Sequence, residues 1–110
     1  MKLTVVLVFS LSLLLSMNAS AADVAAGKAK YDTICASCHG ATGKGDGLAA
    51  VALTPKPADL SKTLLDSAGL ANIIKNGGPA VGKSPIMAGF GGTLSDVEIE
   101  NVAAYIKTLK

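Results

Sequence analysis

Residues 35–39 read Cys35-Ala36-Ser37-Cys38-His39, and this pentapeptide decides how the rest of the chain is interpreted. It holds both cysteines and the single histidine of the 110-residue chain. Cys-x-x-Cys-His is the motif at which a c-type haem is attached. The two thiols add to the two vinyl groups of the porphyrin, and the adjacent imidazole is held at the iron as proximal ligand. The sequence therefore predicts one covalently bound haem c, attached through Cys35 and Cys38, with His39 as an axial ligand.

Three other chemistries compete for this pentapeptide. A thioredoxin-like redox pair also uses Cys-x-x-Cys, but that motif normally follows a strand, and no strand pattern is visible in this sequence. A zinc site needs four ligands from cysteine and histidine, whereas this chain offers only three, all nearly adjacent. A structural disulfide would leave His39 without a role. Haem attachment accounts for all three side chains.

Haem iron needs a sixth ligand unless that position stays open, and Met87 is the best candidate. It is the only methionine after residue 21 and lies in a glycine-rich stretch, 48 residues after His39. A lone methionine more often fills a gap in a core. The chain has no second histidine, however, so lysine is the only other axial candidate. We therefore expect His39 and Met87 to be the axial ligands of the iron.

The first 21 residues have the features of a secretory signal peptide. Lys2 is followed by an apolar run over residues 3–15 and then by Ala19-Ser20-Ala21, which is the order of such a signal. The run is shorter than the roughly 20 apolar residues of a membrane span. We expect residues 1–21 to be removed, so that residues 22–110 form one haem domain in the periplasm without stable membrane insertion.

Composition narrows the function further. The small net charge and apolar content exclude a disordered chain. Without residues 1–21 the chain keeps nine lysines, eight acidic residues and no arginine, so we expect no nucleic-acid partner. The domain is rich in alanine and has no tryptophan. A small domain so poor in large side chains struggles to bury a core, and a porphyrin would supply the missing apolar bulk.

Three stretches predict helices, and the rest of the domain has the composition of loops. The first stretch runs from Asp23 to about residue 36. The second covers residues 67–76 and ends before Gly77, which suits a left-handed cap. The third begins with the capping-box pair Ser95 and Glu98 and keeps an apolar face at helical spacing almost to the C-terminus. No stretch alternates with period two, so the predicted fold class is all-α with large loops.

With these features in place, the chain resembles a class I c-type cytochrome of the small bacterial monohaem kind over essentially all of residues 23–110. The resemblance is carried by residues 35–40 and 43–47, by Pro57-Ala58-Asp59-Leu60, by Gly82-Lys83-Ser84-Pro85-Ile86-Met87 and by Leu94-Ser95-Asp96-Val97-Glu98-Ile99. It implies the cytochrome c fold, in which helices and large loops wrap around one covalently bound haem.

The resemblance also implies roles for residues outside the haem motif. In the family a glycine of the first helix lets an aromatic residue of the last helix approach closely, and Gly27 and Tyr105 match these positions. A proline carbonyl accepts the hydrogen bond of the ligand histidine, which implies this role for Pro55 or Pro57.

Axial ligation by His39 and Met87 indicates electron transfer rather than catalysis. Histidine–methionine ligation raises the reduction potential of haem iron, and six-coordinate iron leaves no place for a substrate. We expect a soluble periplasmic electron carrier of a respiratory or related chain, monomeric and not an enzyme. A membrane dehydrogenase or cytochrome complex would be its donor, and an oxidase or reductase its acceptor. The encounter would use a small interface at the haem edge near residues 35–39.

Two alternative functions stay open. In one, Met87 leaves the iron so that NO or CO binds, as in a haem-based sensor. Ala88 is relevant here, because in the family a proline often follows the ligand methionine. In the other, the protein holds no haem and acts as a thiol–disulfide protein through Cys35 and Cys38.

Overall fold

The computed structural model describes residue 2 and residues 21–110. The predicted signal peptide, residues 1–21, lies outside the described residues except for Lys2 and Ala21, and its removal stays a prediction. The predicted haem domain, residues 22–110, is described in full. Within the described part of the chain, no helix combines the length and the apolar character that a membrane crossing requires.

Regular structure in residues 21–110 consists of four α-helices and three short 3-10 helices, with no β-strand among them. Their order is α1 (Val24–Ile34), α2 (Ala36–His39), η1 (Leu48–Ala52), η2 (Leu60–Lys62), α3 (Ser67–Asn76), η3 (Gly78–Val81) and α4 (Asp96–Ile106). This arrangement confirms the predicted all-α class with large loops. The first helix ends earlier than predicted, and a separate turn, α2, holds most of the haem motif.

Capping side chains explain where the longer helices begin. Asp23 caps α1 and Asp66 caps α3, each by accepting a hydrogen bond from a backbone N–H of the first turn. The predicted capping box of α4 is formed, with Ser95 Oγ accepting from the Glu98 N–H at 3.2 Å and Glu98 Oε1 accepting from the Ser95 N–H at 3.1 Å. Helix α3 ends at Gly77 as predicted. Its φ of 88° is positive, but its ψ of 172° lies outside the left-handed helical region.

Helices α1 and α4 approach each other closely at a glycine. A Cβ at Gly27 would collide with the backbone carbonyl of Asn101, so only glycine fits there. Tyr31 of α1 is fully buried, and its ring meets the ring of Tyr105 of α4 edge-on, with centroids 5.2 Å apart. The predicted close approach is therefore present, but Gly27 faces the backbone at Asn101 while Tyr105 packs on Tyr31.

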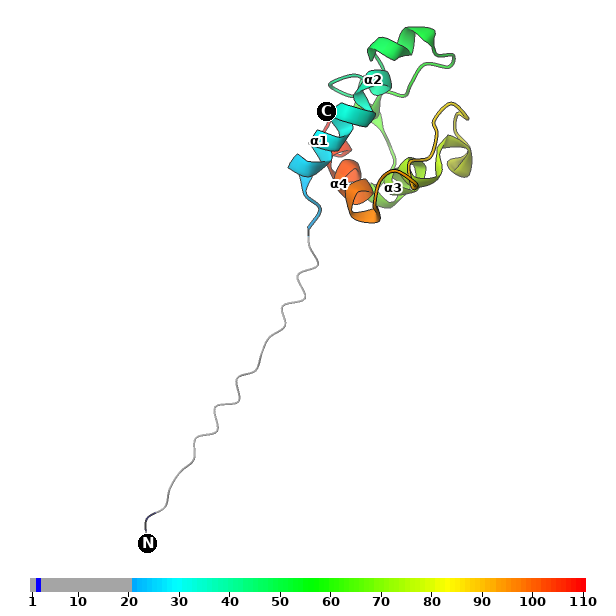
Figure 1. The fold of residues 1–110 in the computed structure, drawn as a ribbon. Helices are drawn as coiled ribbons and strands as arrows, with labels where there is room; N and C mark the ends of the chain where they lie inside the picture. Colours follow the sequence, from blue (N-terminus) through cyan, green and yellow to red (C-terminus); the bar gives the residue numbers. More distant parts are fainter. Residues whose placement is uncertain (1, 3–20) are drawn as a thin grey trace.

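The core lies among α1, α3 and α4, and the two long loops extend from it. Its buried cluster consists of Tyr31, Leu70, Ile74, Leu94, Ile99, Val102, Ala103, Tyr105 and Ile106. In Figure 1 the loop that contains η1 and the loop that contains η3 reach out on the same side of these three helices. The packed helices α1, α3 and α4 therefore lie on one side, and the two loops extend from them.

Candidate functional site

The haem motif lies at the junction of α1 and α2. Cys35 ends α1 and precedes α2, and the backbone N–H groups of Cys38 and His39 both donate to its carbonyl, at 3.2 and 2.9 Å. One helical turn therefore presents all three side chains of the motif. Both cysteines are half-buried free thiols, so the alternative of a structural disulfide is not what the structure contains.

The environment of Cys35 does not favour thiol redox chemistry. Burial, together with the neighbouring Cys38, raises the pKa of the Cys35 thiol to about 11. Reactive redox cysteines have a lowered pKa, because the thiolate is the nucleophile. Cys35 stays protonated at neutral pH, which disfavours the thiol–disulfide alternative.

His39 is oriented by a backbone carbonyl that the sequence did not single out. Its Nδ1 lies 3.1 Å from the carbonyl oxygen of Ala58, so the expectation that Pro55 or Pro57 supports His39 is wrong. The carbonyls of Pro57 and Ala58 have different partners. The Pro57 oxygen packs against Gly45, too close to leave room for a side chain there, and the next carbonyl, that of Ala58, turns towards the imidazole.

This hydrogen bond defines which ring nitrogen is free. A carbonyl can only accept, so Nδ1 of His39 donates its proton to Ala58 and leaves Nε2 with a lone pair. Burial lowers the pKa of His39, although the bond to Ala58 acts in the opposite direction. The neutral imidazole is the form that can bind a metal.

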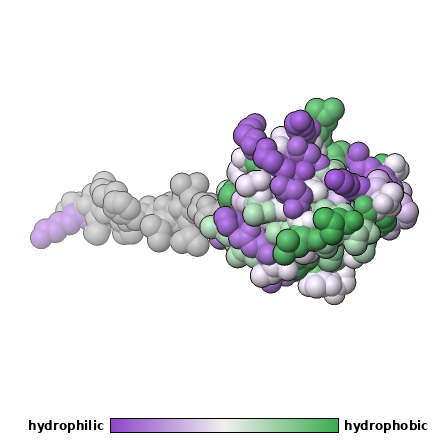
Figure 2. Space-filling view, turned by 90° about the horizontal axis from the view of Figure 1, so that it is seen from above, coloured by the Kyte–Doolittle hydropathy of each residue, from purple (hydrophilic) through white to green (hydrophobic). Residues whose placement is uncertain are grey.

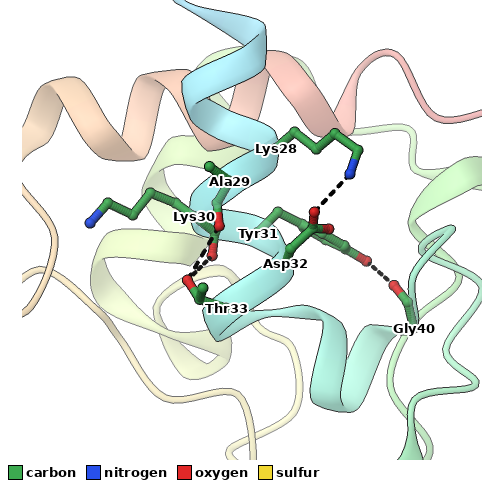
Figure 3. Close-up of polar contacts among 7 residues, drawn as sticks. All are labelled: Lys28, Ala29, Lys30, Tyr31, Asp32, Thr33 and Gly40. Atoms are coloured by element: carbon green, nitrogen blue, oxygen red, sulfur yellow. Dashed lines mark hydrogen bonds and ion pairs between the residues drawn. The ribbon is translucent and has the colours of Figure 1, made fainter.

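The other end of the motif is held by Tyr31. Its hydroxyl donates a buried hydrogen bond of 2.6 Å to the carbonyl of Gly40, the residue after His39 (Figure 3). Burial is the main cause that raises the pKa of Tyr31 well above its ordinary value, so the hydroxyl keeps its proton and donates throughout the physiological range. Helix α1 thereby positions both ends of the pentapeptide.

Met87 lies in the loop between α3 and α4, and this loop is tied to the end of α3. The Met87 carbonyl accepts from the Gly78 N–H at 2.8 Å, and the Met87 N–H donates to the Ser84 carbonyl at 3.3 Å. Past the methionine, the Phe90 N–H donates to the carbonyl of Ile74 at 2.8 Å. The loop is thus held on both sides of Met87, even though Ala88 follows it.

Two cavities lie between the loops, and both are lined by Cys35, His39 and Met87. The larger, of about 390 Å³, reaches Leu70 of α3 and Ile106 of α4. The smaller, of about 140 Å³, is lined by residues that include Cys38, Pro55, Pro57 and Ile86. The structure therefore brings the four predicted site residues together.

The lining suits a flat and mostly apolar group. Leu64 lines the larger cavity although it is 100% exposed, and Ile86 lines the smaller one with 45% exposed. Figure 2 shows hydrophobic residues at the surface beside hydrophilic ones. Covering apolar surface is favourable by about 25 cal/mol per Å². A porphyrin between His39 and Met87 would cover such surface, so the residues present fit haem c.

Sequence reasoning missed Ala58 and Leu64. Every residue has a backbone carbonyl, so no side chain marks Ala58 as the partner of the imidazole. Leu64 stands in an irregular segment where no periodicity shows which way it faces.

The chain was compared with known proteins. Residues 22–106 match the protein family described as cytochrome C oxidase, cbb3-type, subunit III. The chain is similar to cytochrome c-554(547) of Halothiobacillus neapolitanus, with 39% identity over 82% of this chain and 100% of that protein. It is also similar to cytochrome c6 of Synechocystis sp., with 40% identity over 84% of this chain and 70% of that one.

A solved structure shares the fold. A chain of the Kuenenia stuttgartiensis reducing HAO-like protein complex superposes with a TM-score of 0.65 at 23% identity, over 79% of this chain and 42% of that one.

Proposed function

Because this chain belongs to the c-type cytochrome family, with covalently bound haem c and a role in electron transfer, we propose that it is a soluble periplasmic carrier of single electrons between redox partners. The observation that supports this most directly is the convergence of Cys35, His39 and Met87 on the same two cavities. The haem supplies the one-electron chemistry of its iron.

In this proposal the side chains of the site divide the work. Cys35 and Cys38 form the thioethers that attach the haem, and His39 and Met87 are the axial ligands of its iron. The bond from His39 Nδ1 to Ala58 would leave Nε2 available to bind the iron. The backbone hydrogen bonds around Met87 would hold the loop from which its thioether binds the iron.

The residues around the iron would raise its reduction potential. The soft thioether of Met87 favours the ferrous state relative to a second histidine. The apolar lining from Leu70 and Ile106 disfavours the more highly charged ferric state. Both effects raise the potential, as suits a carrier that accepts electrons from a dehydrogenase or cytochrome complex.

The partner would approach at the smaller cavity. Cys38 and the half-exposed Ile86 both line it, so the thioether edge of a haem attached there would lie near the surface. Transient redox encounters need only a small interface. The donor would be a membrane dehydrogenase or cytochrome complex and the acceptor an oxidase or reductase.

Two measurements on the purified holoprotein test this proposal. A haem stain should remain on the polypeptide in a denaturing gel, because thioether bonds survive denaturation. Carbon monoxide added to the reduced protein should leave the Soret band unchanged, because both axial positions are filled. An immediate Soret shift would instead support the alternative in which Met87 leaves the iron and a small ligand binds.

A further inference from the structure

The charged residues of the site gather in the larger cavity. Its lining includes Asp59, Lys62 and Lys83, whereas the lining of the smaller cavity, which contains Cys38, has no charged residue. Helices α3 and α4 contribute only apolar side chains to the larger cavity. One end of the combined site is therefore cationic, and the end that holds Cys38 is uncharged.

The two lysines come from different segments of the chain. Lys62 ends η2, four residues after Ala58, which holds His39. Lys83 lies in the loop of Met87, four residues before that methionine. Among residues 21–110, neither ammonium group forms an ion pair within the structure. Lys62 and Lys83 thus line one cavity, the first from the segment that holds Ala58 and the second from the loop that holds Met87.

Asp59, the acidic residue that lines the cavity, already accepts hydrogen bonds from a neighbouring residue. The Asp59 carboxylate accepts hydrogen bonds from the backbone N–H of Ser61, at 3.0 Å, and from the Ser61 hydroxyl. The bond from the hydroxyl is the largest cause that lowers the pKa of Asp59, and the backbone bond and the nearby charges of Lys62 and Lys44 add to it. Asp59 therefore stays ionised and bound to its own turn. Lys62 is attracted to Asp59 without forming an ion pair, and Lys83 forms none among residues 21–110, so both ammonium groups can pair with another anion.

Haem itself supplies two anions at a known place. Its propionates stand on the two pyrrole rings opposite those that bear the vinyl groups. If Cys35 and Cys38 bind the vinyl carbons, the propionates point away from the end of the site that contains Cys38. We propose that Lys62 and Lys83 bind the two haem propionates, one from each side of the ring. This inference rests on the proposed haem attachment.

Such pairing has two consequences. A cation near the iron disfavours the ferric state, and the effect weakens with distance, so Lys62 and Lys83 raise the reduction potential. An opposite charge also lowers the pKa of a carboxylic acid, so the propionates stay ionised at neutral pH and the potential is insensitive to pH there. Asp59, which also lines the cavity, loses the attraction of Lys62 when that lysine is replaced, but it keeps its bonds to Ser61, which include the largest cause of its lowered pKa.

The test compares two doubly substituted holoproteins that lose the same charge. Lys62→Gln/Lys83→Gln removes the cavity lysines. Lys56→Gln/Lys110→Gln removes two exposed lysines that line neither cavity and do not contribute to the pKa shift of Asp59. Reduction potentials are measured by redox titration between about pH 5 and about pH 8. This range begins near the ordinary pKa of a carboxyl group and includes neutral pH.

In the Lys62→Gln/Lys83→Gln chain we expect a lower potential at the alkaline end than in the control. We also expect a new slope, with the potential falling as pH rises, because the propionates now titrate in this range. Lys62→Arg/Lys83→Arg keeps both positive charges and should therefore keep the pH-independent reduction potential expected of the unsubstituted protein. Equal potentials and equal slopes in the two glutamine chains would overturn the proposal.

Failure of this inference is distinguishable from failure of the proposed function. The haem stain and the weak sulfur-to-iron absorption band are recorded on the same samples. If both are present while the two glutamine chains behave alike, haem ligation stands and only the roles of Lys62 and Lys83 are refuted. If a doubly substituted chain loses its haem, the single variants Lys62→Gln and Lys83→Gln replace it. The reduction potential of each and its pH dependence are then compared with those of Lys56→Gln.

Discussion

His39 Nδ1 lies 3.1 Å from the carbonyl oxygen of Ala58, so the segment between η1 and η2 orients the only imidazole of the chain. The same segment continues into η2 and Lys62, while Met87 and Lys83 share the facing loop. Ala58, which orients His39, and Lys62 therefore belong to one segment, and Met87 and Lys83 belong to another.

Met87→Ala should remove the weak sulfur-to-iron band of the ferric protein and lower its reduction potential, because the thioether no longer stabilises the ferrous state. Carbon monoxide should then bind the reduced protein at once. Ile86→Ala is the matched control, since Ile86 lines the same small cavity next to the methionine and should keep the band. Persistence of the band in Met87→Ala would show that another group is the sixth ligand.

Gly77→Ala should loosen the methionine loop. Gly77 has φ 88° and ψ 172°, a conformation essentially restricted to glycine, and a Cβ there would lie 2.8 Å from the Met87 carbonyl. We expect a loss of about 3 kcal/mol in urea unfolding, with faster carbon monoxide binding. Gly82→Ala, in the ordinary left-handed region with open space around it, should cost only about 1 kcal/mol and leave ligand binding unchanged. Similar losses in both variants would contradict this explanation.

Gly27→Ala should destabilise the contact of α1 and α4. Its Cβ would collide with the backbone carbonyl of Asn101, and a backbone atom cannot move aside without shifting the helix. Overpacking of this kind costs about 1–3 kcal/mol, measurable by urea unfolding of the holoprotein. Gly92→Ala, where a Cβ meets nothing within 4 Å, should change stability by less than about 0.5 kcal/mol. A neutral Gly27→Ala would mean that the helices can separate freely.

Acid should weaken the start of α4 through Glu98. Its ion pair with Lys30, at 2.8 Å, is the first cause that lowers its pKa to about 2, and the bonds to Ser95 add to it. Because the folded pKa lies below the ordinary value of 4.5, this stabilisation is present above that value. It is lost as pH falls towards about 2. Urea midpoints should fall less steeply over this range in Glu98→Gln than in the unsubstituted protein, and equal slopes would contradict the assignment.

Cys35→Ala/Cys38→Ala should lack most tertiary structure. Without attached haem, the larger cavity of about 390 Å³ stays open above Leu70 and Ile106, and the small core cannot compensate for the entropy of ordering the loops. Near-ultraviolet circular dichroism of the variant should be weak at neutral pH. A spectrum with native-like fine structure would show that the polypeptide packs without the porphyrin.

Local features of the sequence were enough to predict several parts of this protein. The side chains of Cys35, Cys38 and His39 are adjacent, so their chemistry follows from spacing alone. The Ser95–Glu98 capping box and the glycine that ends α3 are likewise signals within a few residues, and the structure confirms both. The all-α class followed from the same local patterns.

Tertiary structure alone decided which distant groups meet. Gly27 faces Asn101, and Ala58 rather than a proline accepts the bond from His39. Backbone carbonyls are chemically alike at every position, so no residue type could mark the one that turns inward. The placement of Lys62 and Lys83 on one cavity is of the same kind. Exposed lysines look equivalent in a sequence, and only the path of two loops shows which of them share a site.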